Sequence, residues 1–157
     1  MKFFRAWGCE VTAFTSSESK REEAKALGAH RVVSSRDRES MKAIAGSLNF
    51  ILDTINVPLD WDVLMGTLAP KGRLHLVGAL LEPLPLNMVG MIFGQKTVSA
   101  SPVGSRGATD TMLAFAARHS IVPQVEHFPM RQINDAFEHL RAGRARYRVV
   151  LDADFAS

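Results

Sequence analysis

Short segments rich in β-branched and aromatic residues alternate with helix-like segments along the whole chain. Strands and helices that alternate with short connections are typical of βαβ units, whose crossover helices make neighbouring strands parallel. Right-handed crossovers then produce an α/β fold with a doubly wound parallel sheet. The nearly continuous apolar run 49–55 predicts a strand buried on both faces. The expected strands are 10–16, 30–35, 49–55, 73–79, 96–101, 121–129 and 146–152.

The predicted helices have recognisable start and stop signals. Ser19 and Glu22 have the spacing of a capping box, and Gly28 has the place of a residue that ends a helix. Pro70-Lys71-Gly72 is expected to end the helix that precedes it, and Gly8 and Gly143 are expected to act as stops as well. The expected helices are 1–8, 19–29, 37–48, 61–68, 88–93, one that includes 112–119, and 133–140.

Composition excludes several classes of protein. The 157 residues, 46% hydrophobic and 22% charged, suit one globular domain, or one domain and part of another. The net charge of +3 comes from basic residues scattered among acids, which is poor evidence for a nucleic-acid partner. The single cysteine excludes a disulfide within the chain and fits a cytoplasmic location. Since no apolar run approaches about 20 residues, no membrane span is expected.

Hydroxyls and cations gather where the first predicted strand ends. Thr15, Ser16 and Ser17 end that strand, and Lys20 and Arg21 follow at the start of the next helix. Cations are electrostatically unfavourable near the positive end of a helix. Hydroxyl donors, free helix N–H groups and a cation together can form an anion site. The alternative is an ordinary helix N-cap followed by solvated basic residues.

Several linked segments give the chain a family resemblance. The stretch 2–37 and the later segments FILDTI, LAPKGRLHLVGA, SASPVGSRGATDTMLAF and RARYRVVLD keep the order and spacing of one family. The chain resembles the zinc-dependent medium-chain alcohol dehydrogenases, and within them the NADP-preferring branch similar to cinnamyl alcohol dehydrogenase. The resemblance covers essentially the whole chain and about the C-terminal half of such an enzyme.

The resemblance also implies which parts of the family pattern are missing. The chain contains no G-x-G-x-x-G, so the first strand and the glycine-rich turn of a Rossmann-like cofactor domain are not found in it. Residues 1–120 are expected to be a partial NADP-binding Rossmann domain. Residues 121–157 are expected to form a β-α-β segment that belongs to the family's catalytic domain. That domain supplies the zinc ligands, so neither a metal-binding nor a catalytic residue is expected in this chain.

The resemblance implies a cofactor role for residues at four strand ends and on the last strand. At the first strand end, hydroxyls replace the acidic residue that selects NAD, which favours the 2′-phosphate of NADP(H). At the other strand ends, tight-turn chemistry is the alternative, or, for Asp53, capping of the next helix. For Arg148, which would face the pyrophosphate, the alternative is a surface residue. The expected cofactor-binding residues are Thr15, Ser16, Ser17, Lys20, Arg21, Asp53, Thr54, Ile55, Val77, Gly78, Ala79, Ser99, Ala100, Ser101 and Arg148.

Two hypotheses for function remain open. The first is the cofactor-binding portion of a zinc-dependent NADP(H) alcohol dehydrogenase or aldehyde reductase, inactive by itself. The second is a catalytically inactive nucleotide-binding or dimerisation module. The resemblance implies a homodimer through the edge strand Lys96–Ser101. His75, in an apolar strand, is expected to be packed or hydrogen-bonded.

Overall fold

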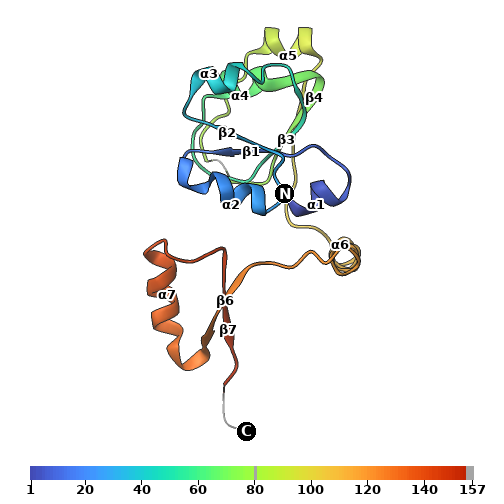
Figure 1. The fold of residues 1–157 in the computed structure, drawn as a ribbon. Coiled ribbons are helices and arrows are strands. Elements are labelled where there is room, and N and C mark those ends of the chain that lie inside the picture. Colours follow the sequence, from blue (N-terminus) through green and yellow to red (C-terminus); the bar gives the residue numbers. More distant parts are fainter. Residues whose placement is uncertain (80, 155–157) are drawn as a thin grey trace. The chain divides into compact units, whose positions relative to one another are not determined.

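The protein forms two compact units, Met1–Thr109 and Asp110–Ser157. The structure is a computed structural model that describes residues 1–79 and 81–154 (Figure 1). The boundary between the units falls inside helix α6 (Arg106–Arg118). The sequence placed its domain boundary after residue 120, just beyond the end of this helix.

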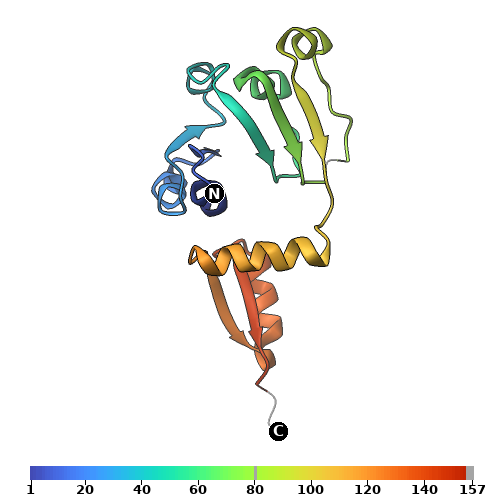
Figure 2. The same ribbon diagram turned by 90° about the vertical axis from the view of Figure 1, so that its right-hand side faces the viewer.

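All strand pairs in the first unit are parallel, which confirms the predicted α/β class. The strands are β1 (Thr12–Thr15), β2 (Arg31–Ser34), β3 (Leu48–Asp53), β4 (Leu68–Leu76) and β5 (Thr97–Ala100). β1 pairs with β2, and β3, β4 and β5 form a three-stranded sheet (Figure 2). The described strands therefore form two small sheets rather than one continuous doubly wound sheet. β1 and β3 each have one strand partner among the described residues, so each keeps one unpaired edge.

Local signals explain where most helices of this unit begin and end. The helices are α1 (Lys2–Ala6), η1 (Glu18–Lys20), α2 (Arg21–Ala26), α3 (Arg38–Lys42), α4 (Trp61–Thr67) and α5 (Met88–Gly94). The side chains of Asp37, Asp60 and Asn87 accept backbone N–H groups at the starts of α3, α4 and α5. Gly8 and Gly28 have positive φ angles after α1 and α2, as expected for residues that end a helix.

Three local predictions are wrong. Ser19 lies inside the 3-10 turn η1 and its hydroxyl contacts Ser17, so it forms no capping box. The helix predicted over 37–48 is shorter, because the chain turns after Lys42 and enters β3 at Leu48. Residues 70–72 do not end α4; they lie within β4, where Lys71 has a positive φ angle and the register with β3 shifts.

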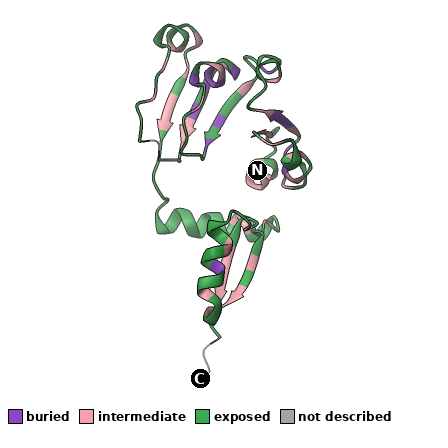
Figure 3. Cartoon of the chain, turned by 90° about the vertical axis from the view of Figure 1, so that its left-hand side faces the viewer, coloured by how far each residue is buried: buried purple, intermediate pink, exposed green. Residues whose placement is uncertain are grey.

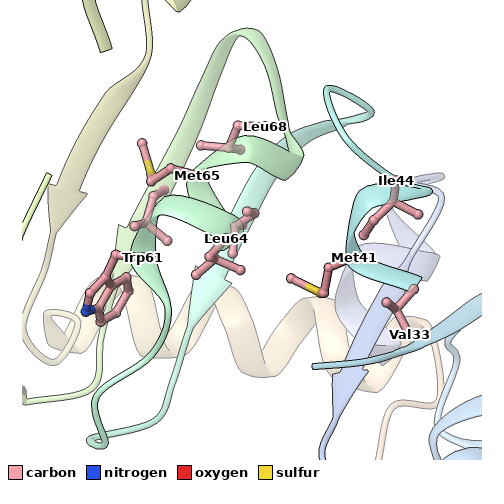
Figure 4. Close-up of a cluster of buried hydrophobic side chains, with 9 residues drawn as sticks. Val33, Met41, Ile44, Trp61, Leu64, Met65 and Leu68 are labelled. Atoms are coloured by element: carbon pink, nitrogen blue, oxygen red, sulfur yellow. The ribbon is translucent and has the colours of Figure 1, made fainter. Parts of the chain in front are cut away.

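One hydrophobic core holds the two sheets of the first unit together. Leu74 in β4 and Val33 in β2 both belong to it, although their strands lie in different sheets. Helices α3 and α4 supply most of the other side chains, which Figure 4 shows between the strands. The buried members are Val33, Met41, Ile44, Ile51, Trp61, Leu64, Met65, Leu68 and Leu74.

The other face of the three-stranded sheet is only partly covered. Ile51 and Asp53 of β3 are buried, but Phe50 and Leu52 are 42% and 41% exposed (Figure 3). Phe50 has a ring neighbour in Phe4 of α1, with centroids 5.8 Å apart. The expectation that this strand is buried on both faces is therefore wrong for this chain, because the core helices pack against one face alone.

The second unit contains a β-α-β segment, as expected. Its elements are β6 (Val125–Pro129), η2 (Met130–Gln132), α7 (Ile133–Arg141) and β7 (Arg148–Asp152), and β6 and β7 are parallel. Ala136 of α7 is buried. Glu126 of β6 contacts His139 Nε2 of α7 at 2.7 Å and accepts the backbone N–H of Arg146. This carboxylate therefore ties the strand both to the helix and to the loop before β7.

Candidate cofactor site

Parallel pairing brings several predicted cofactor residues to one edge of a sheet. Asp53 pairs with Leu76, and Leu76 pairs with Ala100, so β3, β4 and β5 end together. The residues that follow these strands are therefore neighbours, as in the crevice that open α/β sheets use for ligands (Figure 2). They comprise Thr54, Ile55, Val77, Gly78, Ala79 and Ser101.

The hydroxyl cluster after β1 is partly engaged in local turns. Thr15 Oγ1 lies 3.1 Å from both the backbone N and the carbonyl O of Ser17. Ser17 Oγ lies 2.7 Å from Ser19 Oγ. Ser16 and Lys20 are exposed, and in the described part of the chain no acid pairs with Lys20. The groups free to meet an anion here are therefore Ser16, Lys20 and the remaining capacity of the serine hydroxyl pair.

Arg21 is held by other protein groups. Its guanidinium forms a bidentate pair with Glu18 and donates from Nη1 to the carbonyl of Val32 at 2.8 Å. The hydrogen bond from Arg21 lowers the pKa of the Glu18 carboxyl. Arg21 therefore neutralises the acid that would oppose an anion at this place, and Lys20 is the cation left available. The predicted direct contact of Arg21 with cofactor stays a prediction.

Asp53 has an unusual environment for an acid. The residue is 7% exposed; its Oδ1 accepts the backbone N–H of Ile55 at 3.3 Å, and its Oδ2 is buried without a hydrogen-bond partner among the described residues. Burial raises the pKa of the Asp53 carboxyl. Asp60, not Asp53, caps α4, so the capping alternative is wrong. The carbonyl of Asp53 accepts from Val77 at 2.9 Å and so joins the ends of β3 and β4.

The raised pKa gives a prediction for stability against pH. An acid whose pKa is higher in the folded state stabilises the fold below its unfolded value, 3.8, and loses that contribution as pH rises through the folded value. Asp53→Asn is therefore expected to be more stable than the natural chain at neutral pH, with the difference disappearing in acid. Urea unfolding at a series of pH values measures this, with the exposed Asp62→Asn as control. Identical pH profiles for Asp53→Asn and the natural chain would contradict it.

Gly78 packs against backbone rather than against open space. A Cβ atom built on Gly78 would overlap the carbonyl oxygen of Ile55 and lie 2.7 Å from its carbonyl carbon. In the structure, the group that approaches this α-carbon so closely is the loop after β3. The glycine is therefore needed to join two strand ends of the candidate site.

His75 connects two predicted cofactor residues, a link that the sequence did not indicate. Its Nδ1 lies 2.9 Å from Ser99 Oγ and its Nε2 lies 2.8 Å from Ser101 Oγ. The expectation that this histidine is packed or hydrogen-bonded is confirmed, since its ring also stacks on Phe50. The alternation of Ser99 and Ser101 opposite a histidine on the neighbouring strand is the pattern that could have revealed it.

The last predicted cofactor residue, Arg148, belongs to the second unit, where it is exposed at the start of β7. A cavity of about 240 Å³ lies beside α4 and α5, and Lys96, on its wall, donates to the carbonyl of Met65 at 2.6 Å. None of the predicted cofactor residues lines it. The lining residues are Asp62, Met65, Gly66, Leu86, Asn87, Gly90, Met91 and Lys96.

Within 1–79 and 81–154, no three His, Cys, Asp or Glu side chains gather closely enough to hold a metal ion. The same residues contain no helix whose length and apolar character would let it cross a membrane.

Comparison with known proteins assigns the family. The profile described as zinc-binding dehydrogenase matches residues 1–118. The chain belongs to the zinc-binding dehydrogenase family. Aldehyde reductase AdhA of Synechocystis is 52% identical over 151 residues, which are 96% of this chain and 45% of that protein. Cinnamyl alcohol dehydrogenase 2 of Rauvolfia serpentina is 38% identical over 97% of this chain and 42% of its own length.

Solved structures of family members agree. A cinnamyl alcohol dehydrogenase from Sorghum bicolor has a TM-score of 0.87 and 38% identity, over 96% of this chain and 43% of that chain. A Helicobacter pylori enzyme, CAD, solved with NADP(H), has a TM-score of 0.77 and 28% identity over 96% and 43%. This chain therefore spans less than half the length of these relatives. The predicted relation to the C-terminal half of medium-chain zinc alcohol dehydrogenases is confirmed.

Proposed function

We propose that these residues form the NADP(H)-binding portion of an alcohol dehydrogenase or aldehyde reductase that works in the cytoplasm. The observation that carries the proposal is the exposed Lys20 beside serine hydroxyls at the end of β1, next to a Glu18 that Arg21 already neutralises. In a Rossmann-like fold this place faces the adenosine ribose, where an acid would repel a 2′-phosphate. The names of the relatives, aldehyde reductase and cinnamyl alcohol dehydrogenase, agree with it.

In this proposal, the two ends of the cofactor meet different groups of the chain. Thr15, Ser16, Ser17 and Lys20 bind the 2′-phosphate, with Arg21 as a neighbour that keeps Glu18 from opposing it. Arg148 neutralises part of the pyrophosphate. The nicotinamide, which accepts or donates the hydride when it is bound, lies along the backbone at the strand ends. Val77, Gly78 and Ala79 are proposed to lie near the nicotinamide ribose, and Ser99, Ala100 and Ser101 near the carboxamide. Asp53, Thr54 and Ile55 are proposed to lie near the adenosine and its ribose.

The described residues do not fit a zinc ion. Tetrahedral zinc sites need three or four closely spaced cysteine, histidine or carboxylate ligands, and the described side chains form no such group. We therefore assign no zinc-dependent step to this chain, although the family is described as zinc-binding. The proposed role of these residues is to bind and orient the cofactor.

A turnover assay tests whether this chain binds the cofactor without supplying the zinc-dependent chemistry. The 157-residue chain is expected to show no alcohol oxidation when it is incubated with zinc, NADP⁺ and cinnamyl alcohol, as followed by absorbance of the reduced cofactor. The reason is that the described residues contribute the proposed cofactor contacts but form no metal ligand set. Zinc-dependent turnover by this chain would contradict the proposed role.

The second candidate function is an assembly module, and exposed apolar residues favour it. Met88, Val89, Ile92 and Phe93 of α5 are 63–85% exposed, and β5 pairs with β4 alone among the described strands. An unpaired strand edge readily pairs with another chain. We propose that two copies associate through the edge strand Lys96–Ser101, in the enzyme or in an inactive module alike.

A proline on this edge tests the association. Ser101 N donates to Leu76 O at 3.3 Å, and alternate residues of a parallel strand bond opposite neighbours, so the N–H of Ala100 points to the open edge. Ala100→Pro is expected to shift the mass in light scattering toward the 17.3 kDa monomer, whereas Ala100→Ser keeps the dimer. A natural chain that stays monomeric, or a proline variant that dimerises equally well, would refute the edge pairing.

A further inference from the structure

The side chain of His75 lies on the open face of the three-stranded sheet. Register places Leu52, His75 and Ser99 side by side on neighbouring strands, so their side chains share one face. The imidazole stacks on Phe50 with centroids 6.2 Å apart and a 22° angle between the rings. Its two nitrogens reach two hydroxyls of β5 and of the residue after it, as described above. The ring orientation is therefore fixed from three directions.

The neighbouring groups favour one of the two placements of the ring proton. Ser99 Oγ also lies 3.5 Å from the carbonyl oxygen of Leu74, which can only accept. A Ser99 proton directed to that carbonyl leaves the Ser99 hydroxyl to accept from His75, which places the hydrogen on Nδ1. In the neutral imidazole, Nε2 is then an acceptor, and the Ser101 hydroxyl donates to it at 2.8 Å.

This arrangement determines whether the Ser101 hydroxyl donates a hydrogen bond to a ligand or accepts one from it. A serine hydroxyl has one proton and two lone pairs, and His75 takes the proton. Ser101 is exposed and directly follows β5, at the sheet edge where Val77 to Ala79 also lie. The outward side of the Ser101 oxygen therefore presents lone pairs, which suit a donating N–H group and repel another acceptor.

We propose that His75 is a positioning residue that makes Ser101 a hydrogen-bond acceptor for the primary amide of a nicotinamide ring. This inference rests on the proposed NADP(H) function and adds a side-chain contact to it. The amide nitrogen of the ring carries two hydrogens, and one of them binds Ser101 Oγ. Replacing that amide nitrogen by a methyl group removes the donor, so the hydrogen bond to Ser101 Oγ no longer contributes to affinity.

Two substitutions separate the two bonds of His75. An asparagine amide reaches about as far as Nδ1 and keeps the contact with Ser99, whereas a glutamine amide reaches about as far as Nε2 and keeps the contact with Ser101. The measured quantity is the ratio of the dissociation constant of 2′,5′-ADP to that of NADP⁺, which isolates the nicotinamide end. His75→Asn and Ser101→Ala are expected to lower this ratio about fivefold, the effect of losing one neutral hydrogen bond, and His75→Gln to retain it.

The probes distinguish this inference from the function on which it rests. For 3-acetylpyridine adenine dinucleotide phosphate, with a methyl group in place of the amide nitrogen, all variants are expected to bind as the natural chain does. Equal losses in His75→Asn and His75→Gln, or equal losses with the acetylpyridine probe, would overturn the inference while 2′,5′-ADP still binds. Failure of 2′,5′-ADP and NADP⁺ to bind the natural chain would overturn the proposed function as well.

The position of the proton can be measured without any ligand. Nitrogen-15 chemical shifts of the His75 ring in alkaline buffer distinguish the two neutral tautomers. We expect hydrogen on Nδ1. If Nε2 carried the hydrogen, the ring would donate to Ser101 and the serine proton would not be directed to His75. That result would overturn the inference directly.

Discussion

Replacing Gly78 with alanine is expected to lower the free energy of unfolding by about 2–3 kcal/mol, as overpacking at a tight site does. The new methyl group would overlap the carbonyl of Ile55, which is backbone and has no side-chain freedom with which to move away. The ends of β3 and β4 would have to separate, and the bond from Val77 N to Asp53 O would lengthen. Urea unfolding monitored by circular dichroism measures the loss.

Gly66→Ala is the matched control for this experiment. Gly66 lies inside α4, and a Cβ atom added there meets nothing within 4 Å. Alanine favours a helix over glycine by about 0.5–1 kcal/mol, so this variant should be slightly more stable than the natural chain. A Gly78→Ala variant as stable as Gly66→Ala would show that the loop after β3 does not need the glycine.

Replacing Lys20 with alanine is expected to weaken NADPH binding about ten- to a hundredfold and to leave NADH binding unchanged. A hydrogen bond to a charged group contributes about 1.5–3 kcal/mol, and every 1.4 kcal/mol is about a factor of ten in affinity. NADH lacks the 2′-phosphate that the ammonium is proposed to meet. Fluorescence titration with both nucleotides, in parallel on the natural chain and the variant, measures the two dissociation constants.

Lys25→Ala controls for the loss of one positive charge. Lys25 lies in α2, which begins directly after Lys20, and pairs with Glu22 at 2.8 Å. It should alter NADPH affinity far less than Lys20→Ala does. If Lys20→Ala leaves the preference for NADPH over NADH unchanged, the 2′-phosphate is not bound at this place.

Much of the first unit follows from alternation along the chain. Every expected strand is present, at least in part, and every pair is parallel, because short strand–helix connections leave few other arrangements. Stops at Gly8, Gly28 and Gly143 are confirmed by positive φ angles, which glycine adopts without the strain of a Cβ atom. These signals are local, so the sequence alone reveals them.

The wrong predictions concern features that depend on distant neighbours. Residues 70–72 have the composition of a turn, yet the ladder between β3 and β4 absorbs them as an irregularity of the strand. Phe50 and Leu52 belong to an apolar run, but which face of a strand is covered depends on the helices that pack there.

For the candidate site, the sequence predicted where residues lie in the fold better than it predicted which side chains contact each other. Residues after β3, β4 and β5 were expected to be neighbours, and the register places them at one edge. The pairing of Arg21 with Glu18 and the bridge from His75 to two serines depend on side-chain directions, and for the bridge also on strand register. Neither follows from residue types and spacing along the chain.

The proposed 2′-phosphate site should make this chain distinguish NADPH from NADH. The most direct measurement is the melting temperature of the natural chain with no nucleotide, with NADPH and with NADH at equal concentration. A ligand at about 100 times its dissociation constant stabilises by about 2.7 kcal/mol, so a selective rise of several degrees with NADPH is the predicted result. Equal shifts with both nucleotides, or no shift with either, would contradict the account.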